Sequence, residues 1–202
     1  MEFSADQLDA LREIVNIAMG RAGDRLARLL GCFIELPVPI VRFVDAPDVR
    51  EAIRAMVRID GDVTAVRQAF SSVAPGECIV IYGDASVHEL GDLMASDATD
   101  AGAPRHEVLL EVTNLLVGAC AGGIGEQLGQ ELSYSAPSII VANARIDEVL
   151  DPANVPWRTA LLLEVNFRIE GRTFLAHILM FWPESAVSRV RESLDGFLAD
   201  LG

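Results

Sequence analysis

The chain has 202 residues, of which 51% are hydrophobic and 23% are charged. These values are typical of a folded globular protein with a sizeable core, so they exclude a disordered or fibrous chain. The formal net charge is −14, and all 16 basic residues are arginines. This charge argues against nucleic acid or anionic lipid as a partner, and the absence of lysine excludes chemistry that needs its amine.

The three cysteines and three histidines are isolated in the sequence. Cys32, Cys78 and Cys120 form no CxxC pair, which predicts buried, reduced thiols and no zinc site. The first ten residues, MEFSADQLDA, lack the basic and apolar regions of a signal peptide. No segment has the roughly 18 consecutive apolar residues that a membrane-spanning helix needs. We therefore expect a cytoplasmic protein that does not insert into a membrane and has no cofactor or metal ion of its own.

The first half of the chain predicts a long helix, a strand, a short helix, a hairpin and a further helix. Ser4 can cap the long helix, and Gly31 is a plausible stop for it. Pro37 and Pro39 make the start of the following strand an edge or an irregular entry. The expected helices are at residues 5–30, 48–55 and 84–94. Strands are expected at 33–44 and 78–83, and β-like stretches at 56–60 and 62–73.

The second half predicts the same order of elements. The turn-rich segment ASDATDAGAP (95–104) is the best internal boundary, and Pro183 opens the last helix. The expected helix, strand, short helix, hairpin strands and helix lie at residues 105–129, 135–143, 145–150, 159–169, 173–182 and 184–201.

A shift of 98 residues aligns the two long helices. The residues that coincide are Asp9 with Glu107, Glu13 with Glu111, Asn16 with Asn114, Gly20 with Gly118, Gly31 with Gly129 and Pro39 with Pro137. We interpret the match as an internal repeat of about 1–97 and 98–202. Two such halves would share one core. The sequence therefore predicts a single α+β domain with pseudo-two-fold symmetry, an antiparallel sheet and two long helices that carry the candidate sites.

On a helical wheel, Glu13 and Gly20 lie within about 60° of Asn16, whereas the apolar residues of the helix lie on the opposite side. The second helix repeats this arrangement with Glu111, Asn114 and Gly118. One E-x-x-N match has little weight, because chance alone supplies about 0.4 of them in such a chain. Exposed Glu and Asn are also usually solvated surface. Two matches in register, each with a glycine four residues later, favour a functional explanation.

A carboxamide is neither a nucleophile nor a general base at neutral pH, but it can hold a water molecule in line with a scissile bond. Orientation alone suffices only for a labile bond such as an acyl phosphate. The neighbouring carboxylate would repel a phosphate, so we expect it to pair with a cation on the partner. Both groups then suit a phosphorylated protein that brings its own metal ion.

The segments D-A-L-R-E-I-V-N-I-A-M-G (9–20) and E-V-L-L-E-V-T-N-L-L-V-G (107–118) resemble the CheC family, which includes CheX and FliY. The resemblance extends over the whole chain and implies a single CheC-like domain. It also implies a phosphatase of the response regulator CheY, in which Asn orients the attacking water and Glu engages a lysine of the regulator, whose Mg²⁺ stays on CheY. By resemblance, Glu13 and Asn16 form one catalytic site and Glu111 and Asn114 the other. The protein CheD is a further possible partner.

Two other functions stay open. FliM, a component of the flagellar switch, shares a similar middle domain but lacks the E-x-x-N pairs. An adaptor that binds phosphorylated CheY or CheD with little catalysis is also compatible with the sequence. Departures from the family pattern at Ala18, Met19 and Arg21 leave open which site is more active, although the wheel places Ala18 and Met19 away from the site.

Three other features have simpler explanations. His177 is expected to be a core histidine rather than a ligand. The glycine-rich stretch 121–129 has no preceding strand and no following lysine, so a phosphate-binding loop is not expected there. Glu164 and Glu170 are too isolated to form a paired-carboxylate site.

Overall fold

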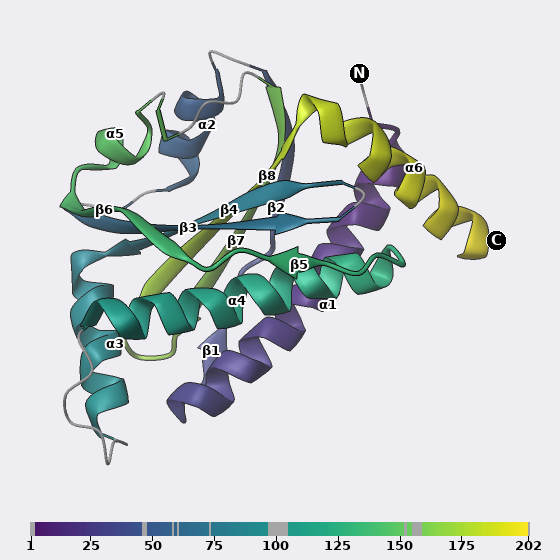
Figure 1. The fold of residues 1–202 in the computed structure, drawn as a ribbon. Coiled ribbons are helices and arrows are strands. Elements are labelled where there is room, and N and C mark those ends of the chain that lie inside the picture. The colour runs from purple at the N-terminus through teal and green to yellow at the C-terminus, as the bar shows by residue number, and fades with distance from the viewer. Residues whose placement is uncertain are drawn as a thin grey trace.

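The computed structural model describes residues 3–45, 48–57, 59, 61–72, 74–96, 105–151, 153–154 and 159–201. In these ranges, eight strands form one antiparallel sheet and six helices cover its two faces (Figure 1). The α+β class and the antiparallel sheet predicted from the sequence are confirmed.

The elements follow each other in two similar series. The first series is α1 (Ala5–Leu30), β1 (Ile34–Glu35), β2 (Ile40–Asp45), α2 (Asp48–Met56), β3 (Val63–Ser71), β4 (Gly76–Gly83) and α3 (Asp84–Ser96). The second series is α4 (Arg105–Gln127), β5 (Ser133–Tyr134), β6 (Ser138–Ala144), α5 (Ile146–Val149), β7 (Thr159–Ile169), β8 (Leu175–Pro183) and α6 (Glu184–Leu201).

The strand order β1-β7-β8-β4-β3-β5 is symmetric when each strand of one series is matched with its counterpart in the other, that is, β1 with β5, β3 with β7 and β4 with β8. The central strands are β4 and β8, which pair with each other and with their hairpin partners β3 and β7. Strands β1 and β2 pair with β7 of the second series, and β5 and β6 pair with β3 of the first series. Each half thus supplies the outer strands of the other half. An internal repeat would produce this exchange, and the repeat itself stays a prediction.

Each face of the sheet carries its own core. On one face, α1, α3, α4 and α6 pack on alternate residues of the strands, among them Val66, Val80, Phe167 and Ile178. On the other face, α2 and α5 cover a smaller cluster that includes Ile79. Figure 1 shows α2 and α5 on the side of the sheet opposite α1 and α4. The period-2 pattern of the strands therefore decides which face each side chain enters.

Helix α1 begins and ends where its sequence predicts. The Ser4 hydroxyl accepts a hydrogen bond from the Gln7 backbone N–H at 3.1 Å, and the Gln7 side chain accepts one from the Ser4 N–H at 2.9 Å. This reciprocal cap satisfies two helix donors that would otherwise have no partner. At the other end Gly31 adopts φ 62°, the left-handed conformation that closes helices.

The structure differs from the predicted elements in four places. The strand expected at 135–143 begins only at Ser138 and is preceded by the two-residue strand β5. The strand expected at 33–44 is divided into β1 and β2, because Pro37 and Pro39 lie between them and lack the N–H that a ladder needs. The stretch 56–60 is no strand where it is described, since Met56 ends α2 and Val57 lies outside any strand. Helix α4 ends at Gln127, two residues early. Most of the expected boundary at 95–104 lies outside the described residues.

Helix α4 is long and apolar enough to cross a membrane, judged by length and composition alone, with a mean hydropathy of 1.6 over its most apolar window. Two-thirds of that window (67%) is buried inside the protein. The apolar character of α4 is therefore explained by its packing in the core against α1 and β3.

Candidate functional site

The first candidate site lies on the exposed face of α1. Glu13, Asn16 and Gly20 are exposed to solvent. Ala18 and Met19, which interrupt the family pattern, are each 1% exposed and lie in the core. The helical period thus places the two groups of residues on opposite faces, as the sequence predicts.

The second candidate site has the same arrangement on α4. Glu111 and Asn114 are exposed, Gly118 is half-buried, and Glu107 one turn before Glu111 is exposed as well. The residues expected on the core face are all buried: Leu109, Val112, Leu116 and Cys120. We refer to Glu13, Asn16 and Gly20 as the first site and to Glu111, Asn114 and Gly118 as the second site.

The glycines of the two sites are not required by packing. A Cβ atom added at Gly20 or Gly118 would meet nothing within 4 Å. In contrast, a Cβ at Gly23 would lie 2.8 Å from Leu36 Cδ1, and one at Gly123 would lie 2.9 Å from Ala18 Cβ. Gly23 and Gly123 therefore allow close packing within the protein, whereas Gly20 and Gly118 leave bare backbone that an external surface can approach.

Asn114 is held by a side chain of the sheet. Gln68 of β3 is 1% exposed, and its Nε2 atom donates a hydrogen bond to Asn114 Oδ1 at 2.7 Å. The same Nε2 atom donates to the backbone oxygen of Ser135, just after β5, at 2.9 Å. The carboxamide of Asn114 therefore has an anchored oxygen, although the side chain lies on the surface.

Tyr134 of β5 lies over the same stretch of α4. Its hydroxyl donates to the backbone oxygen of Gly118 at 3.4 Å, and a Cβ at Gly122 would lie 2.9 Å from that hydroxyl. Burial is the main cause that raises the pKa of Tyr134 above its ordinary value. The phenol is therefore protonated at neutral pH and remains a donor.

The first site has a different surrounding. Among the described residues, no hydrogen-bond partner is found for the Asn16 side chain, and Asp9, earlier on the same face, pairs with Arg12 at 2.7 Å. The side chain of Leu36 lies against Gly23. Large apolar side chains are exposed on this part of the chain, namely Ile17 (38%), Phe33 (66%), Leu36 (37%), Val38 (87%) and Ile40 (37%).

Arg21 lies at the flank of the first site and connects the two site helices. Its guanidinium forms an ion pair with Glu126 of α4, and both side chains are about half exposed or more. Since α1 and α4 also pack against each other, the two sites lie on one packed pair of helices.

His177 is a core histidine, as the sequence predicts. It is 4% exposed, and its Nδ1 atom lies 3.2 Å from Oε1 of Glu164, which is 2% exposed. Asn166 donates to the same Oε1 at 3.1 Å. These three residues lie on the face of the sheet that α2 and α5 cover, so they are separated from the first and second sites by the sheet.

The cysteines are free. Cys78 and Cys120 are buried, and burial raises their pKa above the ordinary value, so both thiols are protonated and inert. Cys32 is only half-buried, which corrects the expectation that all three are buried. Within the described ranges, no group of three or more His, Cys, Asp and Glu side chains is placed to hold a metal ion.

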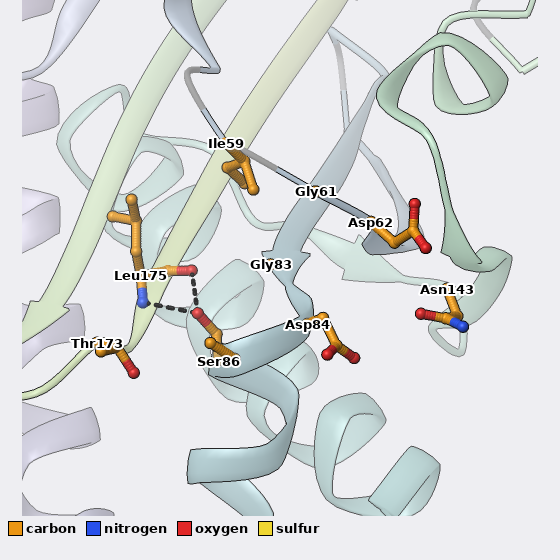
Figure 2. A pocket seen from close by; sticks show the side chains of 10 residues that line it. Ile59, Gly61, Asp62, Gly83, Asp84, Ser86, Asn143, Thr173 and Leu175 are labelled. Carbon is orange, nitrogen blue, oxygen red and sulfur yellow. Dashed lines mark hydrogen bonds between the residues drawn. The ribbon is translucent and has the colours of Figure 1, made fainter.

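A cavity of about 490 Å³ lies away from both sites, where β4 runs into α3 (Figure 2). The hydroxyl of Ser86 accepts from the Leu175 N–H at 3.0 Å and donates to the Leu175 carbonyl oxygen at 3.2 Å, which fixes α3 to the start of β8. Asp62, Asp84 and Asn143 line another side of this cavity. None of the motif residues contributes to it.

The structure resembles solved chemotaxis and flagellar proteins. FliY from Thermotoga maritima superposes with a TM-score of 0.70 at 21% identity, over 98% of this chain and 100% of that chain. CheX from Desulfovibrio desulfuricans has a TM-score of 0.55 at 16% identity, over 83% of this chain and 97% of that chain. The chain has the CheC/CheX/FliY fold.

FliM from H. pylori, solved in complex with SpeE, superposes with a TM-score of 0.62 at 9% identity, over 96% of this chain and 97% of that chain. No protein-family model matches the sequence, and a search of curated proteins finds no match. Identities this low establish the fold alone, so the function has to be argued from the site.

Sequence reasoning identified the exposed faces of both helices but missed Gln68. A signal was present, because Gln68 interrupts the apolar residues Val66 and Phe70 that β3 directs toward α4. A polar side chain at such a position needs a partner when it is buried. The partner could not be identified, because Gln68 and Asn114 are 46 residues apart.

Proposed function

We propose that the protein is a chemotaxis phosphatase of the CheC family, which hydrolyses the aspartyl phosphate of a CheY-type response regulator. The observation that carries this proposal is the pair of exposed Glu and Asn side chains, repeated on two helices and each followed by an open glycine. The proposed catalytic residues are Glu13, Asn16, Glu111 and Asn114.

Each Asn would act by orientation. A carboxamide that enters the partner's active site can accept a hydrogen bond from a water molecule and donate to a phosphoryl oxygen, which places the water in line with the scissile P–O bond. The water then attacks phosphorus, the aspartyl oxygen leaves as a carboxylate, and inorganic phosphate is released. The phosphatase contributes no nucleophile of its own to this reaction.

Each Glu would act on the partner. Glu13 and Glu111 are exposed, and a carboxylate one helical turn from the Asn can form a charge-assisted hydrogen bond with a lysine of the regulator. This contact would fix the register of the two proteins without a carboxylate next to the phosphate. The Mg²⁺ ion of the reaction would be the one that the phosphorylated regulator binds, and the location would be the cytoplasm, where such a regulator acts.

The resemblance to FliM supports a second candidate, a non-catalytic component of the flagellar switch or an adaptor for phosphorylated CheY or CheD. The fold of this chain is equally compatible with such a role. The phosphatase is favoured because glycines inside helices cost up to about 1 kcal/mol each relative to alanine, and Gly20 and Gly118 have no packing reason to be glycine. An adaptor would bind the partner equally well without a water-positioning Asn.

The test is the decay of a CheY-type regulator phosphorylated with acetyl phosphate in Mg²⁺. We expect wild-type protein to accelerate phosphate release, and the Asn16→Ala, Asn114→Ala double variant to be at least 10- to 100-fold slower, because positioning of the water is lost. A double variant as fast as wild type would exclude these residues as catalytic. Binding of the phosphorylated regulator without acceleration would favour the adaptor, and titration with CheD would show whether the rate depends on it.

A further inference from the structure

We propose that Gln68 is a positioning residue for Asn114, so that the second site holds its carboxamide in a fixed orientation before a partner arrives and the first site does not. The inference rests on the proposed function and goes beyond it, because it assigns a role to a buried residue of the sheet and makes the second site the faster of the two.

The orientation follows from a chain of three groups. The backbone oxygen of Ser135 can only accept, so the Gln68 group 2.9 Å away must be the Nε2 amide. The same Nε2 lies 2.7 Å from Asn114, which must therefore present Oδ1 to it. Both N–H groups of Asn114 and the second lone pair of its Oδ1 remain available to a water molecule or a phosphoryl oxygen.

Stability alone does not explain a glutamine at this position. The Oε1 atom of Gln68 is buried and has no hydrogen-bond partner among the described residues, and an unpartnered buried oxygen is unfavourable. Its neighbours on the same face of β3, Val66 and Phe70, are apolar and belong to the core. An apolar residue at 68 would suit that core but would leave two acceptors without this donor, namely the Ser135 backbone oxygen and Asn114 Oδ1. Of these two contacts, the one with Asn114 reaches the site.

In the part of the chain that the structure describes, no side chain holds Asn16 as Gln68 holds Asn114. Arg67, the residue before Gln68, pairs with Ser138 of β6. Ile40, which lies 98 residues before Ser138, pairs with Glu164 of β7. Through β6 the position in β7 that corresponds to Gln68 is therefore Val165. Through β4 it is Phe167, because Gln68 pairs with Cys78 and Phe167 pairs with Ala176, 98 residues after Cys78. Neither residue type has a hydrogen-bonding group that could hold Asn16.

The kinetic test isolates each site in the intact protein. The Asn16→Ala background reports on the second site, and the Asn114→Ala background reports on the first. We expect Gln68→Met to lower the turnover of the second site about 2- to 10-fold, the effect of having to order one side chain. The half-saturating concentration of regulator should stay the same, because Gln68 is buried. The first site should be unaffected.

A matched control is Thr113→Val, next to Asn114 in the chain. Thr113 is 0% exposed and shares a hydrogen bond of 2.9 Å with Tyr82, so this variant also loses a buried hydrogen bond close to the site but leaves Asn114 anchored. We expect unchanged turnover at both sites for Thr113→Val. Equal losses at both sites for Gln68→Met, or no loss at the second, would overturn the inference.

A second measurement does not depend on activity, and its first comparison needs only the wild-type protein. In the wild-type protein, NMR relaxation of the side-chain amides should show Asn114 more ordered than Asn16, and Gln68→Met should remove this difference. Equal order in the wild type would overturn the positioning role. If the Asn variants leave the hydrolysis rate unchanged while Asn114 is ordered, the proposed function fails and the contact stands.

Discussion

The first and second sites carry the same three residue types on matching helical faces, but their surroundings are opposite in character. Asn114 is anchored by Gln68, which also donates to Ser135, and Tyr134 donates to Gly118 of the same site. No partner is found for Asn16 within the described residues. The positions that correspond to Leu36 and Val38 under the 98-residue shift are Tyr134 and Ala136. The segment after α1 therefore carries the aliphatic side chains of Leu36, which lies against Gly23, and Val38. The corresponding segment after α4 carries a phenol and a methyl group.

The comparison teaches that two sites with the same functional group can differ in how that group is positioned. At the second site, internal hydrogen bonds fix the carboxamide before binding. At the first site, an exposed apolar surface would have to provide the energy through contact with the partner, and the Asn would become ordered in the complex. Turnover should therefore be higher at the second site, and affinity at the first should depend on apolar contact.

The largest expected difference is between the single Asn variants. If the second site is about 2- to 10-fold faster, Asn114→Ala should lower total phosphate release about 3- to 10-fold, whereas Asn16→Ala should lower it less than about twofold. Initial rates of phosphate release at saturating phosphorylated regulator measure both effects. Equal losses for the two variants would show that the anchored site has no advantage.

The next effect is at the glycine of the second site. Gly118→Ala should stabilise α4 by up to about 1 kcal/mol and yet weaken regulator binding about fivefold, because a Cβ occupies the space that the partner approaches. Urea unfolding and a binding titration measure the two quantities. Gly196→Ala on α6 is the control, since a Cβ there also meets nothing within 4 Å. It should raise stability alone, and a parallel loss of binding would contradict the account.

A smaller effect is expected from the aliphatic side chains of the segment after α1. Val38 is 87% exposed, and Val38→Ser should raise the half-saturating concentration of regulator about threefold in the Asn114→Ala background, since apolar area is lost from the contact. Ala136→Ser, at the corresponding position of the second site, is the matched change. It should have little effect in the Asn16→Ala background, and similar shifts at both sites would remove the proposed distinction.

The smallest effect concerns the ion pair between the two helices. Arg21 and Glu126 are largely exposed, so a double-mutant cycle with alanine at both positions should give a coupling free energy of unfolding below about 1 kcal/mol. The relative rates of the two sites should not change. A large coupling, or a change in that ratio, would show that the sites are linked through this pair.

The parts of the structure that follow local periods could be predicted from the sequence. Spacing of 3.6 residues placed Asn16 and Asn114 on exposed faces, and the capping residues Ser4 and Gly31 defined α1. The split of the strand at 33–44 was signalled by its prolines, but the pairing of β1 and β2 with β7 was not. The anchoring of Asn114 depends on pairing between segments far apart in the chain, which a single sequence does not encode in any local pattern.

The most direct test of the central claim is the rate of phosphate release from a phosphorylated CheY-type regulator under single-turnover conditions, with saturating protein and with binding measured in the same samples. The account predicts that the Asn16→Ala, Asn114→Ala double variant still binds the regulator and that its rate falls to that of the regulator alone. A double variant that binds and still hydrolyses at the wild-type rate would contradict the account.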